Sequence, residues 1–215
     1  GYTDNTFRPN RTCTRAEMVT FLWRLEYCPE PNSMETKFTD LRKNSFYEKA
    51  VLWAAENGIV NGVSETKFCP NAPVKRSEVV ALLYRLDKEP KYDTSAGSAF
   101  KDVDPEKDSG RFYYDAMCWA TQNDIVKGYP DNTFQPNAYC KRGEIVTFLY
   151  RMQNSPESKA ENPFTDVKAD AYYANAVLWA VENGVTTGAS ATTFDPAGDC
   201  TRGQIVTFLY RCLSK

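Results

Sequence analysis

Four arginines at a regular spacing are the residues best suited to bind a ligand. Arg15, Arg76, Arg142 and Arg202 follow one another at intervals of 61, 66 and 60 residues. Each lies at the expected start of a helix, where the first N–H groups have no partner within the helix and favour anions. A guanidinium adds a planar fork of donors, and charge-assisted hydrogen bonds of this kind contribute about 1.5–3 kcal/mol. The pattern predicts a compact anion, such as a carboxylate or phosphate, beside each arginine.

Two other interpretations of these arginines remain open. A cation at a helix start is opposed by the helix dipole, so an acidic residue of the chain could supply the compensating charge. Asp40, Asp102 and Asp166 are the candidates for a buried carboxylate. Alternatively, each arginine is simply solvated on the first turn of its helix.

The composition excludes several classes of function. The chain has 215 residues, 42% of them hydrophobic, which is enough for the core of one large domain or two small ones. Its 26 basic and 28 acidic residues leave a net charge of -2, which argues against a nucleic-acid partner. No apolar run approaches the roughly 18 residues of a membrane span, so no membrane insertion is expected.

Catalysis is also unexpected. The sequence has no histidine, which removes the commonest general base and the favoured zinc ligand. The carboxylates recur in every repeat as helix caps and turns and form no unique pair for a glycosidase. Asp4, Asn5, Asp131 and Asn132 form turns with too few carboxylates for calcium. We therefore predict no catalytic residue, no metal site and no cofactor.

The arginines belong to four copies of one sequence frame. It begins at Thr6, Lys67, Thr133 and Thr193, and the first copy reads TFRPNRTCTRAEMVTFLWRL. A second frame, exemplified by FTDLRKNSFYEKAVLWAAENGIVNG, precedes three copies and begins at Phe38, Phe100 and Phe164. The predicted organisation is half a repeat at 1–25 and complete repeats at 38–86, 100–152 and 164–213. The chain opens within the motif, so we expect a piece of a longer, exported protein.

Each repeat is predicted to be a helix, a turn and a second helix. The first helix carries an apolar stripe around Trp53 and ends at Gly58, which suits a left-handed cap. The second helix begins after Thr14, which has capping-box spacing to Glu17. Lys75 and Lys141 replace that threonine, which weakens those two helix starts by roughly 0.5–2 kcal/mol each.

The tryptophans and most cysteines are predicted to lie in the core. Trp53, Trp119 and Trp179 fall on the apolar stripe of the first helices. Cys13, Cys118, Cys140 and Cys200 replace apolar residues of other copies and are expected to be buried small hydrophobes. A disulfide involving Cys28, Cys69 or Cys212 remains open.

These frames resemble the S-layer homology (SLH) family. Its repeat runs from an F-x-D opening, through W-A-x-x-x-G-I-x-x-G and an F-x-P turn, to a second helix that starts T-R-A-E. Thr14-Arg15-Ala16-Glu17 matches that start in full. The other copies read Lys-Arg-Ser-Glu at 75–78, Lys-Arg-Gly-Glu at 141–144 and Thr-Arg-Gly-Gln at 201–204. We therefore expect unequal binding grooves.

The resemblance implies both the fold and the function. The fold is all-α, with tandem helix-turn-helix repeats packed around a pseudo-threefold axis and a central helical bundle. The function is non-covalent anchoring of a surface protein to the bacterial cell wall. The partner is an anionic, pyruvylated secondary wall polysaccharide in the grooves between repeats, and the location is the extracellular cell surface. The ligand-binding residues are Arg15, Arg76, Arg142, Arg202, Glu17, Glu144, Tyr2 and Tyr129.

A second hypothesis belongs to the structural class. The repeats could mediate protein–protein contacts in an assembly, with self-association through the incomplete first repeat. Mass measurements at several concentrations distinguish such an assembly from an anchoring monomer.

Overall fold

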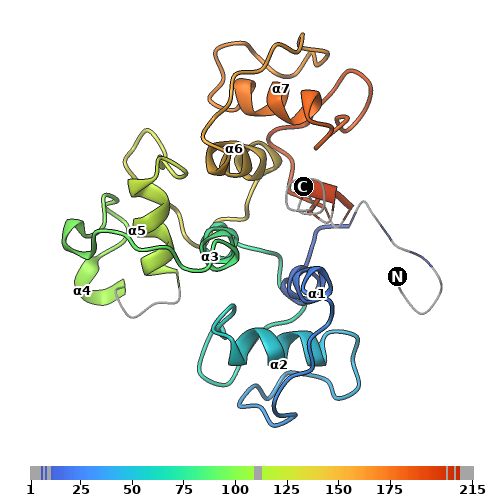
Figure 1. Ribbon diagram of the computed structural model, residues 1–215, viewed down its shortest axis with the longest axis vertical. Helices are drawn as coiled ribbons and strands as arrows, with labels where there is room; N and C mark the ends of the chain where they lie inside the picture. Colours follow the sequence, from blue (N-terminus) through green and yellow to red (C-terminus); the bar gives the residue numbers. More distant parts are fainter. Residues whose placement is uncertain are drawn as a thin grey trace. The chain divides into compact units, whose positions relative to one another are not determined.

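The fold is helical throughout the part of the chain that the structure describes. This computed structural model describes Thr6, Arg8, 11–108, 113–201, 203–205 and 207–208. It divides into two compact units, Cys13–Tyr139 and Gly1–Thr12 together with Cys140–Lys215. Among these residues only isolated β-bridges accompany the helices, which confirms the all-α class. Figure 1 shows α1 (Arg15–Leu25), α2 (Glu48–Glu56), α3 (Arg76–Leu86), α4 (Pro105–Asp108), α5 (Tyr114–Gln122), α6 (Arg142–Met152) and α7 (Ala174–Glu182), and a 3₁₀ turn, η1, spans Thr94–Ala96.

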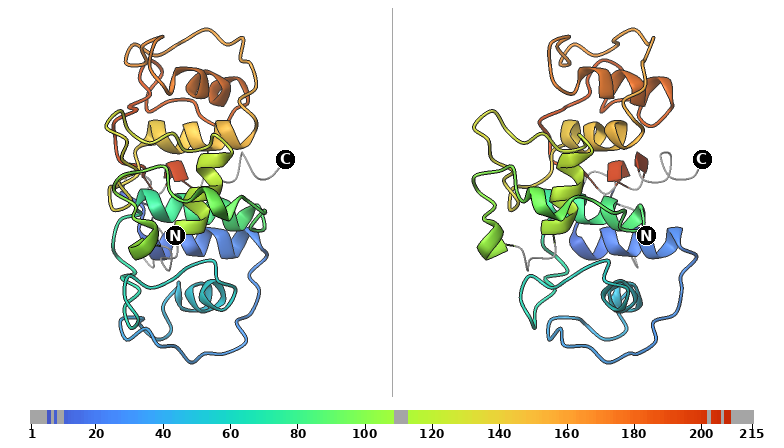
Figure 2. Two further views of the ribbon diagram at one scale, coloured as in Figure 1. Left: turned by 90° about the vertical axis from the view of Figure 1, so that its left-hand side faces the viewer. Right: turned by 60° about the vertical axis from the view of Figure 1, so that its left-hand side comes forward.

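Helices pair across repeat boundaries. The second helix of the half repeat, α1, packs against α2, the first helix of the next repeat, and α3 pairs with α5 in the same way. The second unit repeats this arrangement with α6 and α7. Within the first unit, α2 crosses α1 and α5 crosses α3 (Figure 2). The sequence period and the packing pair are therefore offset by one helix.

A pair of phenylalanines joins the two frames of each repeat. Phe38 and Phe68 lie with ring centroids 5.7 Å apart, and both are buried. Phe100 with Phe134 and Phe164 with Phe194 repeat the contact at 5.7 and 5.8 Å. These contacts fasten the F-x-D opening to the F-x-P turn, so the turn is held in place before the second helix begins.

The predicted helix ends are confirmed. Gly58 and Gly184 adopt φ angles of 68° and 67°, and Asp124 takes the same left-handed conformation at 57°. At the start of α1, the Thr14 hydroxyl accepts from the Glu17 N–H, and the Glu17 carboxylate accepts from the Thr14 N–H at 3.0 Å. Lysine has no side-chain acceptor, so at Lys75 only the second half survives, where Glu78 accepts from the Lys75 N–H at 2.9 Å.

The predicted core residues are buried. Trp53, Trp119 and Trp179 are 9, 3 and 5% exposed. Cys13, Cys118, Cys140 and Cys200 are 1, 2, 4 and 5% exposed. All six cysteines in the described part of the chain are free thiols, so no disulfide joins them.

The cysteines give a test of this burial. Burial raises the pKa of the Cys200 thiol from 9.0 to about 12, which lowers its thiolate fraction about 1000-fold. At pH 8 the folded chain should react with iodoacetamide at exposed Cys28 and remain unmodified at Cys200, as peptide mass spectrometry can measure. Both should react in denaturant. Equal native rates at the two residues would contradict the burial of Cys200.

Candidate functional site

Arg15, the first of the predicted anion-binding residues, is buried and fully engaged within the chain. Its side chain is 6% exposed, and its Nε and Nη2 donate to the carbonyls of Phe68 and Asn61, both at 2.8 Å. Its Nη1 forms an ion pair with the Glu78 carboxylate on α3. Burial lowers the pKa of Arg15 to about 10, so the guanidinium keeps its charge at neutral pH. The arginine thus ties the start of α1 to the following repeat.

The same contact recurs at the next two arginines. Arg76 Nε donates to the Phe134 carbonyl at 2.9 Å, and Arg142 Nε donates to the Phe194 carbonyl at 2.8 Å. Their side chains are only 3 and 1% exposed. The prediction of guanidinium groups open to solvent is therefore wrong for all three described arginines, because each turns into the F-x-P turn of the following repeat.

The first-turn amides are also occupied. The N–H groups of Arg15 and Ala16 donate to the carbonyls of Ala72 and Pro70 at 2.9 and 3.0 Å. Arg76 and Arg142 donate in the same way, to Ala138 at 2.9 Å and Gly198 at 3.0 Å. The prediction that these amides await a ligand is corrected, since carbonyls of the following turn already satisfy them.

The three conserved-position aspartates hold that turn and do not form the ion pair. Asp40 accepts from the Phe68 and Cys69 N–H groups at 2.9 and 2.8 Å, and these bonds lower the pKa of its carboxyl against the effect of desolvation. Asp102 and Asp166 bind the equivalent amides in their own repeats. The residue after the phenylalanine has a left-handed φ in each case, 58° at Cys69. The predicted internal acid exists for Arg15, but it is Glu78.

The remaining predicted ligand-binding residues have roles within the fold or lie outside the described residues. Glu17 and Glu144 accept from the N–H groups of the residues that cap their helices, at 3.0 and 2.9 Å, and both are buried. The Tyr129 ring lies under the Arg76 guanidinium, 4.7 Å from its centroid. Tyr2 and Arg202 lie outside the described residues.

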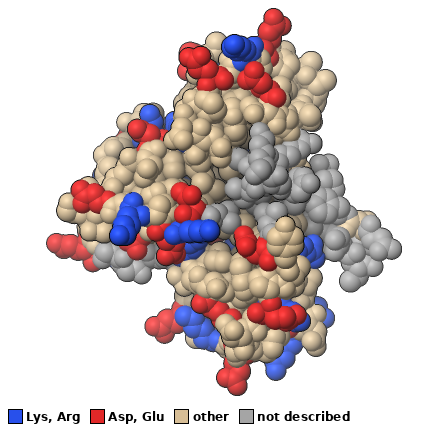
Figure 3. All heavy atoms as spheres, viewed as in Figure 1, with Lys and Arg blue, Asp and Glu red and all other residues tan. Residues whose placement is uncertain are grey.

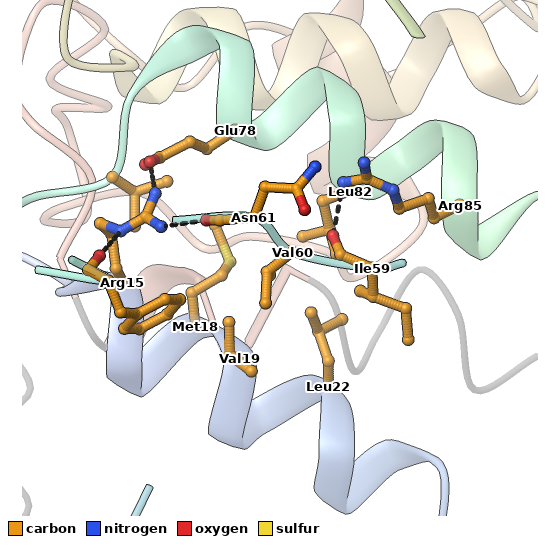
Figure 4. A pocket seen from close by; sticks show the side chains of 12 residues that line it. Arg15, Met18, Val19, Leu22, Ile59, Val60, Asn61, Glu78, Leu82 and Arg85 are labelled. Carbon is orange, nitrogen blue, oxygen red and sulfur yellow. Dashed lines mark hydrogen bonds and ion pairs between the residues drawn. The ribbon is translucent and has the colours of Figure 1, made fainter. Parts of the chain in front are cut away.

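An apolar cavity lies between α1 and α3. It measures about 380 Å³ with its mouth included, and Met18, Val19, Leu22 and Leu82 line it. Figure 4 shows Arg15 at one end and Arg85 at the other, where Arg85 Nη1 donates to the Ile59 carbonyl. Because Glu78 and two carbonyls hold Arg15, this cavity offers apolar surface more than a free charge.

A larger and more polar depression in the same unit is the best candidate for a binding site. It measures about 1160 Å³ with its mouth included, and two consecutive repeats form its walls. Its polar lining includes Lys37, Asn61, Lys75, Ser77, Asp102 and Asn137. We name it the Lys75 groove. It brings together donors, acceptors and a cation, as recognition of an acidic sugar requires.

The charge of this groove distinguishes it from the equivalent place in the other unit. Lys75 Nζ donates to a neutral partner, Asn137 Oδ1, at 2.9 Å. Its counterpart Lys141 is 2.6 Å from Asp199 Oδ1 and is neutralised by it. Elsewhere, the face drawn in Figure 3 shows acidic and basic side chains interspersed over the described residues. Lys75 therefore provides a local positive charge.

Sequence reasoning missed this groove because its residues come from four separate segments. Lys75 was noticed only as a poor helix cap. The available signal was its charge, which appears beside the arginine in two copies where the family has threonine.

The comparisons with known proteins agree with the repeated architecture. A helical repeat chain with these tied turns belongs to the class of surface-anchoring modules. The profile of the S-layer homology domain matches residues 1–19, 37–80, 99–146 and 163–206, more than half of the chain. The chain belongs to the S-layer homology domain family. Among the described residues, no helix has the length and apolar character of a membrane span.

Its relatives are proteins of bacterial surfaces. The chain is 29% identical to "Cell surface glycoprotein 1" and to "Cellulosome-anchoring protein", both of Acetivibrio thermocellus, over 81 and 78% of its length. It is 31% identical to "Surface-layer 125 kDa protein" of Lysinibacillus sphaericus over 70%. The matches span only 8, 38 and 12% of those proteins. Other relatives are named as enzymes. These relationships confirm the predicted cell-surface class.

Proposed function

We propose that this chain anchors a larger surface protein to the bacterial cell wall by binding an anionic, pyruvylated wall polysaccharide. The Lys75 groove carries the proposal, because it is polar, open and formed by two consecutive repeats. Membership of the S-layer homology family supports the anchoring role. The chain itself acts as a binding module without catalysis, and any enzymatic activity belongs to other parts of the parent protein.

The groove contains complementary groups for an acidic saccharide. Lys75 supplies positive charge for the acid group of the sugar. Asp102 uses its two oxygens on backbone amides but keeps lone pairs for sugar hydroxyls. Asn61 and Asn137 offer amide donors and acceptors on opposite sides of the lining. Glu78 adds little negative charge, since Arg15 neutralises it.

The arginine and glutamate residues of the T-R-A-E positions enter this proposal in two ways. Arg15 and Arg76, with Glu17 and Glu144, act through the walls of the grooves, because their contacts fix the turns that the sugar touches. Arg202, Tyr2 and Tyr129 stay predictions as direct contacts. The pseudo-threefold arrangement likewise stays a prediction of the family resemblance.

Self-association through the half repeat is the weaker alternative. Its helix α1 already packs against α2, and Val19 of α1 belongs to the same buried core as Val51 of α2. The apolar face of the half repeat is thus covered within the chain.

Replacing Lys75 should weaken wall binding. Lys75→Gln removes the local charge, and we expect at least a tenfold loss of affinity for isolated wall polymer, the equivalent of about 1.4 kcal/mol. Isothermal titration calorimetry at fixed ionic strength measures it.

Lys141→Gln is the matched control. It removes the same charge at the same repeat position, but Asp199 already neutralises that lysine. We expect less than a threefold effect. Equal losses in the two variants, or no loss at Lys75, would refute the assignment of the groove.

A further inference from the structure

Arg142 is a buried cation with unused hydrogen-bond donors. Its side chain is 1% exposed, and its Nε donates to the Phe194 carbonyl at 2.8 Å. Its Nη1 and Nη2 are buried and have no hydrogen-bond partner among the residues that the structure describes. Burying charged donors without an acceptor is costly, so such groups normally have a counter-ion.

A single residue difference explains the missing partner. Arg15 donates its N–H to the Ala72 carbonyl and pairs with Glu78, six residues further on. Arg142 donates its N–H to the Gly198 carbonyl, and six residues further on the chain has Gln204. The two frames are equivalent, but the acid is replaced by an amide.

Gln204 is unable to act as the glutamate does. Glu78 uses one carboxylate oxygen on the Lys75 N–H and the other on Arg15. Gln204 Oε1 accepts from the Thr201 N–H at 2.9 Å, which preserves the cap. Its other terminal group is then an NH₂ donor, which repels the donors of a guanidinium and leaves them without an acceptor.

No other group in the described part of this unit neutralises Arg142. Asp166 and Asp195 raise its pKa by their charge, but Asp166 is bound to the N–H groups of Phe194 and Asp195. The neighbouring Cys200 thiol has a pKa raised by burial to about 12, so it is uncharged at neutral pH. Desolvation is the largest effect on Arg142 and lowers its pKa.

We infer that Nη1 and Nη2 of Arg142 form a binding site for a compact carboxylate, which replaces the acid that Gln204 lacks. Two parallel N–H groups fit the two oxygens of a carboxylate. The Phe194 ring, 4.7 Å from the guanidinium carbon, covers one face and favours a small, planar anion. Acetate, lactate or pyruvate has this chemistry, as does a carboxylate substituent of a glycan. The inference does not depend on the Lys75 groove.

Acetate binding is tested by thermal unfolding of the whole chain. Sodium acetate replaces the sodium salt of a bulky sulfonate buffer at constant ionic strength. At ten times the dissociation constant, the apparent folding constant should rise about 11-fold, and Tm should rise with it. In Gln204→Glu the new carboxylate should pair with Arg142, so we expect a higher Tm without acetate and no further rise with it.

Glu78→Gln is the converse variant and protects the test if Gln204→Glu folds poorly. It removes the acid from Arg15 and should create in the first unit the condition that Arg142 has in the second. Its Tm should fall, and acetate should raise it by more than in the unchanged chain. A Gln204→Glu chain that folds but responds to acetate as before, or no acetate response in either the unchanged chain or Glu78→Gln, would overturn the inference.

Intact and depyruvylated wall polymer then separate the two sources of carboxylate. If the glycan supplies the anion, intact polymer should protect the unchanged chain more than Gln204→Glu. If small metabolite acids supply it, acetate alone should distinguish the two chains. Wall binding that persists without any acetate effect would refute this site and leave the proposed function standing.

Discussion

Glu78→Gln should lower the free energy of unfolding by about 3–5 kcal/mol, because it leaves the Arg15 charge buried without its partner. Arg15 is 6% exposed and makes its ion pair with Glu78 across consecutive repeats. The two carbonyl contacts of Arg15 remain in the variant but cannot neutralise the charge. Urea titration followed by circular dichroism measures the loss.

The double variant Arg15→Met with Glu78→Leu is the control. It removes both charges and keeps much of the apolar volume, so we expect it to recover most of the lost stability. The four chains form a double-mutant cycle that isolates the pair. A Glu78→Gln chain as stable as the parent would show that the ion pair does not tie α1 to the following repeat.

Gly128→Ala should destabilise the chain by about 2–5 kcal/mol. Gly128 has a φ of 69°, which costs a residue with a side chain about 1–2 kcal/mol. An added Cβ would also lie 2.3 Å from the Phe100 ring and 2.8 Å from the Thr133 carbonyl. Relieving that overlap disturbs the buried Phe100–Phe134 contact and adds about 1–3 kcal/mol.

Gly58→Ala separates the two causes. Gly58 has nearly the same φ, 68°, but an added Cβ would meet nothing within 4 Å. It should lose only the backbone contribution of about 1–2 kcal/mol. Thermal unfolding of the two variants should differ clearly. Equal losses would mean that the glycine is required for its conformation and not for the close approach of Phe100.

Local features of the fold were predictable from the sequence. The cap of Thr14 with Glu17 and the left-handed ends at Gly58 and Asp124 depend on residues close in sequence, and the structure confirms them. The burial of Trp53 followed from helical periodicity. The pairing of α1 with α2 was not predicted, because periodicity identifies an apolar face and not the helix that covers it.

The candidate site was predicted only in part. The spacing of Arg15, Arg76 and Arg142 correctly marked positions of special chemistry. Their inward orientation depends on the F-x-P turn of the following repeat, at Phe68 for Arg15, more than 50 residues away. The meaning of Gln204 depends on the same long-range contact. Short sequence frames contain no information on which carbonyls meet in space, so the Lys75 groove was also missed.

Binding of purified wall polymer before and after removal of its acid substituents tests the central claim most directly. Calorimetry at fixed ionic strength compares the two polymers against the same chain. The account predicts that intact polymer binds and that polymer freed of its pyruvate groups loses at least tenfold in affinity. Equal affinity for the two polymers, or no binding of the intact one, would contradict it.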